Sequence, residues 1–224
     1  MPSQARKKFD ENAADIEQLV DMYEAMEKLW EDEPGDFPEG MDVLFRSAVV
    51  LMVSHWEAYI EDICGEALEH LVKHSKDSSA LPKAIKQQVA SEILASKNKL
   101  EAWNLADDGW QKLLRARLAA MKVGRDRGFN SPKAQQTKEF VSNTVGIDDV
   151  TKSWTLKKTD PKSSAKKLDA LVAVRGEIAH RGRIKEKLNM DYIAEHIAFL
   201  RGLVAKTGGD INAHVERITK KGLW

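Results

Sequence analysis

Residues 175–182 read RGEIAHRG and hold the two side chains of this chain best suited to phosphodiester chemistry. The guanidinium of Arg175 can bind a phosphate through two parallel hydrogen bonds, and the imidazole of His180 can accept or donate a proton. Together they could hold a phosphodiester and move a proton during its cleavage. The alternative is a core arginine paired with a carboxylate, followed by a histidine that the helix macrodipole favours at a C-terminus.

Arg175 lies on the apolar face of a predicted helix. The sequence LDALVAV precedes it, and helical geometry places Arg175 about 20° from Leu168, in the middle of that face. A cation there needs an anionic partner or a water-filled cleft, because burying an unpaired charge is costly. The partner could be a phosphate or a carboxylate, and Glu57 is a carboxylate that could pair with Arg175.

His180 does not share a face with Arg175 on a regular helix. Five residues of separation place the two about 140° apart around the axis and about 7.5 Å apart along it. They converge only if the helix loosens at Gly176, if it ends before His180, or if a second chain supplies the partner. The small residues Ala173 and Gly176 would let another helix approach closely on that side.

A second arrangement of candidate ligands lies earlier in the chain. His70 and His74 are four residues apart, with Glu66 one turn before them, a spacing that could bind zinc. No cysteine cluster and no third histidine has clear metal spacing, so a metal site is a remote alternative and no metal or other cofactor is expected. The single cysteine, Cys64, is predicted to be a small core residue.

The composition indicates a folded intracellular protein with an uneven charge distribution. One cysteine excludes a disulfide framework, the charged N-terminus lacks an apolar signal core, and the run AVVLMV is too short to span a membrane. A cytoplasmic location and no membrane contact are therefore expected. Residues 1–100 carry 11 Lys and Arg against 20 Asp and Glu, whereas residues 101–224 carry 24 against 15. The basic half could face an anionic partner, pack against the acidic half, or pair head to tail with a second copy.

Apolar residues recur with a helical period, and no stretch alternates as a strand would, so we predict an all-α bundle. The chain is expected to divide into an N-terminal helix and a Pro/Gly linker at 1–40, a helical domain at 41–205, and a short basic tail or helix at 206–224. A long central helix should bend near Gly65, and TGGD should stop the last long helix near Ala205. The predicted helices cover 3–30, 41–74, 82–97, 109–122, 132–144, a segment capped by Ser163 or Ser164 and ending at Gly182, and 190–205 capped by Asn189.

Three segments resemble the RiboL-PSP-type branch of the HEPN superfamily over roughly residues 40–205. They are RSAVVLMVSHWEAYIEDICGEALEHL, FNSPKAQQTKEFVSNTVGIDDVTKSW and LDALVAVRGEIAHRG. The resemblance implies a HEPN-like helical bundle that forms homodimers through the helix carrying the Arg-x4-His element. It also implies a metal-independent endoribonuclease of the toxin or defence type. Arg175 would then hold the scissile phosphate, and His180 would be the general acid or base while the RNA 2′-OH attacks to give a 2′,3′-cyclic phosphate.

The chain departs from the usual form of that element at two positions. Gly176 stands where the family usually has a polar residue, commonly asparagine, and Arg181 stands where a small residue is usual. The superfamily also contains members that only bind RNA, nucleotides or proteins. Two functions therefore stay open, an RNA-cleaving dimer with a cognate antitoxin or other protein partner, and a non-catalytic binding module. The supporting residues expected at the site are Glu57, Gly176, Glu177 and Arg181.

Overall fold

The computed structural model describes residues 2–30, 42–122, 129, 131–157, 159–182 and 188–224. Within these ranges the chain forms helices and no strand, apart from one isolated bridge between Leu156 and Thr159, so the prediction of an all-α fold is confirmed. The predicted Pro/Gly linker, residues 31–40, lies outside the described residues. The helices are α1 (Gln4–Trp30), α2 (Val43–His74), η1 (Ser78–Ala80), α3 (Lys83–Ala95), η2 (Lys99–Leu105), α4 (Gly109–Lys122), α5 (Ala134–Val145), η3 (Val150–Ser153), α6 (Pro161–Arg181) and α7 (Met190–Thr219).

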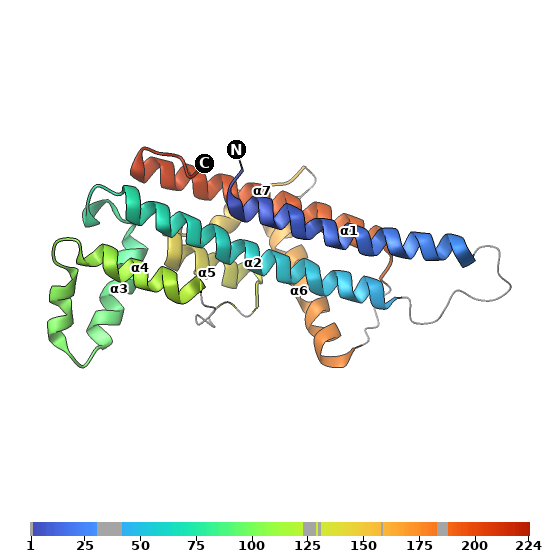
Figure 1. The fold of residues 1–224 in the computed structure, drawn as a ribbon, viewed down its shortest axis with the longest axis horizontal. Coiled ribbons are helices and arrows are strands. Elements are labelled where there is room, and N and C mark those ends of the chain that lie inside the picture. The colour runs from blue at the N-terminus through green and yellow to red at the C-terminus, as the bar shows by residue number, and fades with distance from the viewer. Residues whose placement is uncertain (1, 31–41, 123–128, 130, 158, 183–187) are drawn as a thin grey trace.

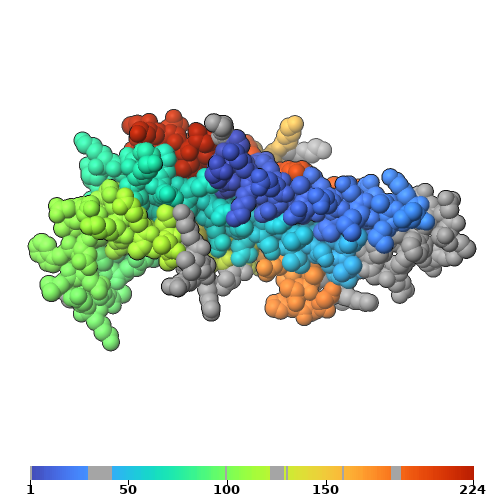
Figure 2. Space-filling view, viewed as in Figure 1, coloured from blue at the N-terminus to red at the C-terminus, as the bar shows by residue number. Residues whose placement is uncertain are grey.

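The long helix α2 is the centre of an elongated bundle (Figure 1). α1 runs antiparallel to it, since the backbone N–H of Ala5 donates to Glu66 Oε1 near one end of α2 and the Tyr23 ring lies on Phe45 near the other. α7 runs parallel to α2 on another side. The α3–η2–α4 segment forms a lobe at one end of the molecule, and α6 projects from the side of the bundle (Figure 2).

Helix α2 meets the length and composition criterion for a membrane-spanning helix. In this bundle, however, it is the core helix, with buried residues on every turn that contact α1, α4, α5, α6 and α7. The helix continues through Gly65, which the sequence marked as a candidate bend. A Cβ at Gly65 would lie 3.6 Å from Leu118 Cδ1 of α4, an ordinary van der Waals contact. Cys64 beside it is fully buried, as predicted, and burial raises the pKa of its thiol.

Two buried tryptophans join α2 to the helices around it. The Trp56 and Trp154 rings meet edge to face with their centroids 5.9 Å apart, and neither side chain is exposed. The Trp154 indole N–H donates to Thr207 Oγ1 of α7 (2.9 Å), and its carbonyl accepts a hydrogen bond from Ser164 Oγ of α6 (2.9 Å). Trp154 thus fixes the start of α6 against both α2 and α7.

Two helices begin at positions other than those predicted. α6 is capped by Asp160, whose Oδ1 accepts from the backbone N–H groups of Lys162 (2.9 Å) and Ser163 (3.1 Å), and not by Ser163 or Ser164. Pro161 occupies the first turn, where its missing N–H costs nothing. α5 begins at Ala134 and not at Pro132, because its first N–H donates to Asp169 of α6 (2.8 Å). A tertiary contact therefore sets the start of α5.

The prediction that TGGD ends the last helix near Ala205 is wrong, because α7 continues to Thr219. Two glycines cost a helix about 1 kcal/mol each relative to alanine, but packing overrides this preference. Gly208 is buried, and the hydroxyl of Tyr59, which donates to the carbonyl of Val204 (2.9 Å), lies 2.7 Å from the point that a Gly208 Cβ would occupy. Tyr59 of α2 therefore requires a glycine at position 208 of α7.

Opposite stability changes are expected for alanine at these neighbouring glycines. A Cβ at Gly209 meets no described atom within 4 Å, so Gly209→Ala should stabilise the protein by about 0.5–1 kcal/mol. Gly208→Ala places its Cβ 2.7 Å from the Tyr59 hydroxyl and should destabilise the protein by about 1–3 kcal/mol. Urea denaturation of the two variants measures the difference. Equal urea midpoints for the two variants would contradict the conclusion that the Tyr59 hydroxyl requires a glycine at position 208.

Candidate functional site

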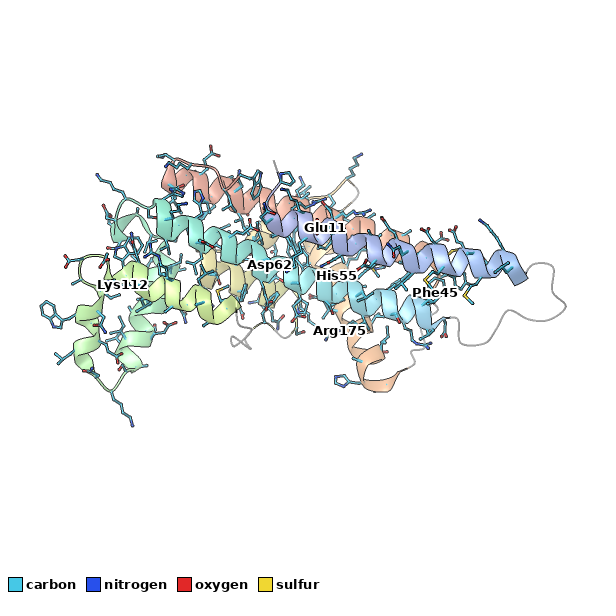
Figure 3. The ribbon with its side chains drawn as sticks, viewed as in Figure 1. Glu11, Phe45, His55, Asp62, Lys112 and Arg175 are labelled. Atoms are coloured by element: carbon cyan, nitrogen blue, oxygen red, sulfur yellow. The ribbon has the colours of Figure 1, made fainter. Side chains whose placement is uncertain are left out.

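Helix α6 carries Arg175 against α2, at the point where the two helices pass each other (Figure 3). The buried residues Leu168, Leu171 and Val172 anchor the turns before Arg175 to the bundle, and Ile178 anchors the turn after it. This pattern confirms that the cation lies on the apolar stripe of its helix. Its side chain is 29% exposed, so it lies at the edge of the core and not in open solvent.

Glu57 is the carboxylate that faces Arg175, as the sequence predicted. Its Oε2 lies 3.9 Å from Arg175 Nη2, and the Glu57 side chain is 24% exposed. This distance is too long for a hydrogen bond, so the pair attracts by charge alone. Burial raises the pKa of the Glu57 carboxyl, and the positive charge of Arg175 lowers it by a smaller amount. The guanidinium is held in place, yet no described residue accepts a hydrogen bond from it.

His180 lies on the surface at the C-terminal end of α6. The helix remains α-helical through Arg181 and ends at Gly182, where φ is +70° and the N–H of Gly182 donates to the carbonyl of Ile178 (2.8 Å). α6 therefore neither loosens at Gly176 nor ends before His180. Two of the three ways to bring Arg175 and His180 together are excluded, and within one chain the two residues lie on different faces.

One edge of α6 has no neighbour in the described part of the chain. Ala173, Glu177 and His180 are exposed, and a Cβ at Gly176 would meet no described atom within 4 Å. We call Ala173, Gly176, Glu177 and His180 the open edge of α6. Its first half consists of small residues, so a second helix could lie close to the backbone there. The predicted supporting residue Arg181, which follows this edge, is also exposed.

The alternative metal site does not assemble among the described residues. No group of three or more potential ligands lies together in these parts of the chain. His70 Nε2 lies 3.3 Å from Thr219 Oγ1 of α7, and the His70 and His74 rings contact each other at a tilt of 52°, with their centroids 4.4 Å apart. Glu66 faces the first turn of α1. These side chains tie the C-terminal half of α2 to α1 and α7.

Two aspartates that support the site were not recognised in the sequence. Asp160 caps α6, and Asp169 joins α6 to α5 through the Ala134 N–H. An aspartate directly before a proline is a helix-start signal, so the sequence TDPKSS already indicated Asp160 as a helix cap. Nothing local marks Asp169, because its partner lies 35 residues away. The basic half of the chain, residues 101–224, is only partly described, since residues 123–128, 130, 158 and 183–187 lie outside the described ranges.

The described residues form a helical bundle around one long core helix, α2, and the helix that carries Arg175 and His180 packs against it. The model of the RiboL-PSP-HEPN family matches residues 11–213, and the chain belongs to this family. The match includes most of α1 and extends into the C-terminal part of α7, beyond the segment 40–205 that carried the resemblance. Neither a curated protein nor a solved structure matches the chain.

Proposed function

We propose that this protein is a metal-independent endoribonuclease that acts as a homodimer. The observation that carries the proposal is the position of Arg175, which is half-buried and charge-paired at 3.9 Å but donates no hydrogen bond to a described residue. Such a guanidinium is oriented while its donors stay available to a phosphate. Because α6 separates Arg175 from His180, the proposal needs a second copy of the helix to complete the site.

The chemistry follows from the two side chains. A neutral His180 accepts the proton of an RNA 2′-OH, and the oxygen attacks the adjacent phosphorus. A P–O bond forms at the 2′ oxygen while the bond to the 5′ oxygen of the next nucleotide breaks. A protonated imidazole supplies the proton to the leaving 5′ oxygen, so that the products carry a 2′,3′-cyclic phosphate and a 5′-OH. Arg175 stabilises the charge that develops on the phosphate oxygens.

The open edge of α6 is the surface that we assign to the dimer. Two copies of α6 packed through Ala173 and Gly176 would bring the histidine of one chain toward the arginine of the other. A dimer with twofold symmetry would contain two copies of the site, because each contact between the subunits occurs twice around the axis. Glu177, Arg181 and the basic residues of the second half of the chain would then flank the cleft and bind the RNA backbone.

The test is cleavage of single-stranded RNA by the purified full chain in EDTA. We expect cleavage to persist in EDTA, and the products to carry a 2′,3′-cyclic phosphate at one new end and a hydroxyl at the other. Induced expression should also arrest growth, as a toxin or defence effector in the cytoplasm would, unless a cognate antitoxin is present. Intact RNA together with normal growth would refute the endoribonuclease.

A specific observation favours the second candidate, a module that binds RNA, a nucleotide or a protein without cleavage. Gly176 provides no side chain at the position where the family usually carries a polar one. A Cβ there meets no described atom within 4 Å, so Gly176→Asn has room for its Cβ. If the protein is a ribonuclease, the added amide should raise the cleavage rate, by about tenfold for one charge-assisted hydrogen bond in the cleft.

Gly176→Ala is the matched control, because it gives α6 the same or better helix propensity but no amide. A rate increase specific to asparagine assigns a role to this position in the cleft. Equal rates for both variants would contradict that role. If neither variant cleaves RNA while both bind it as the original chain does, the binding module is the better description.

A further inference from the structure

Large apolar side chains are exposed on α1 and α2 at the end of the bundle away from the α3–η2–α4 lobe. The C-terminal half of α1 runs there beside the N-terminal half of α2 (Figure 1). Met22 and Leu29 of α1 and Val43 of α2 are exposed, and Leu29 is 73% exposed. Single exposed apolar residues are ordinary, whereas a contiguous apolar surface marks a site of interaction. The positions of these residues around the two helices decide which case applies.

The outward side of α2 carries no charge over its first three turns. With Glu57 as zero, six residues of segment 43–54 lie between about 20° and 140° around the helix, namely Val43, Leu44, Ser47, Val50, Leu51 and Ser54. Val43 is exposed and the other five are partly exposed, while the opposite side of the helix is buried. The outward side of a helix that faces water is normally polar. This side of α2 therefore lacks a neighbour among the described residues.

The apolar residues near the end of α1 face the same way. Four of them lie within an arc of about 80° around the helix, namely Leu19, Met22, Met26 and Leu29. Asp15, one turn earlier, lies in the same arc. Burial lowers the pKa of His55 on α2, and the nearby carboxylate of Asp15 raises it by a smaller amount. Because His55 borders the uncharged side of α2, the arc of α1 and that side of α2 belong to one face of the helix pair.

The two apolar segments also lie level with each other along the antiparallel pair. The Tyr23 ring of α1 lies on the Phe45 ring of α2, with their centroids 4.5 Å apart. The arc of α1 from Leu19 to Leu29 and the uncharged side of α2 from Val43 to Ser54 therefore form one surface, which we call the α1–α2 patch.

We propose that the α1–α2 patch packs against the same patch of a second copy of the chain. Two antiparallel helix pairs that meet through apolar faces form a four-helix bundle. An uncharged patch suits a copy of itself, because twofold symmetry brings any charge near the axis close to an identical charge. The occupant of the patch is thus a second copy of the chain.

The same contact completes the proposed ribonuclease site, and in this respect the inference rests on the proposed function. Val50 lies about 20° from Glu57 around α2, and Glu57 faces Arg175 of α6. The open edge of α6 consists of four residues, whereas a stable interface takes about 20–30 residues and about 800 Å² from each partner. The α1–α2 patch adds apolar area to an edge that is too small to hold a dimer by itself.

Analytical ultracentrifugation of the purified full chain measures the dimer dissociation constant. Leu29→Glu places one carboxylate from each copy in the interface and should raise this constant at least about tenfold, because like charges in an interface repel. Met22→Glu should have the same effect. Leu94→Glu is the matched control, because Leu94 of α3 is 71% exposed outside the patch, and it should leave the constant unchanged. Circular dichroism confirms that each variant is folded.

Tight dimers of the folded Leu29→Glu and Met22→Glu variants would overturn the proposal, and so would an original chain that stays monomeric up to its solubility limit. An equal loss of dimer in Leu94→Glu would also contradict it, since the effect would not be specific to the patch. Dimerisation is measured without RNA. A patch-dependent dimer that leaves RNA intact would support the patch and refute the ribonuclease, whereas an active enzyme whose dimer survives both substitutions would refute the patch alone.

Discussion

Mixing the Arg175→Ala and His180→Ala variants should restore RNA cleavage that neither variant has alone. Each homodimer lacks one of the two groups in both halves of its cleft. In a mixed dimer, the intact arginine of one chain meets the intact histidine of the other. With free subunit exchange about half of the dimers are mixed, so about a quarter of the original activity is expected. The measurement is the cleavage rate after co-refolding or co-expression of the two variants.

Each single substitution should lower the cleavage rate by about 10²–10⁴-fold, the range for a general acid–base group or a group that stabilises transition-state charge. His180 is exposed, so the stability of His180→Ala should stay within about 0.5 kcal/mol of the original. Thermal unfolding checks this point. Inactive single variants that also stay inactive as a mixture would contradict the shared cleft, and an active His180→Ala variant would contradict the role of His180.

The largest loss of stability should come from Trp154→Ala, at about 3–5 kcal/mol. The ring is fully buried, meets Trp56 edge to face, and donates its indole N–H to Thr207 Oγ1. Its removal leaves a cavity between α2, α6 and α7 and an unpaired hydroxyl on α7. Such a loss is a large part of the stability of most domains, so the variant should unfold at a much lower urea concentration.

Trp103→Ala is the matched control for this prediction. The Trp103 side chain is 77% exposed on η2, so its removal should change the stability by less than about 0.5 kcal/mol. Urea denaturation followed by circular dichroism compares the two variants without relying on tryptophan fluorescence. Similar midpoints for Trp103→Ala and Trp154→Ala would show that the Trp154 cluster is not the joint between α6 and the bundle.

The sequence by itself determined the helical class, the central position of α2 and the anomalous position of Arg175. These features depend on apolar residues that recur every three to four positions, a signal that local geometry fixes. The same periodicity placed Arg175 on a buried stripe, and the cost of an unpaired charge then predicted a carboxylate such as Glu57. Only the folded structure shows the 3.9 Å distance between Arg175 and Glu57 and the partial exposure of both side chains.

Only the tertiary structure decided where helices start and stop and which faces stay open. α7 continues through Gly208 and Gly209 because the Tyr59 hydroxyl and the Trp154 indole pack against that segment, and these contacts outweigh a local preference of about 1 kcal/mol per glycine. α5 starts at Ala134 because Asp169, far away in sequence, accepts its first N–H. α6 stays helical through Arg181, which places Arg175 and His180 of one chain on different faces. Helical geometry predicted this separation for a regular helix, but only the folded structure showed that α6 stays regular between the two residues.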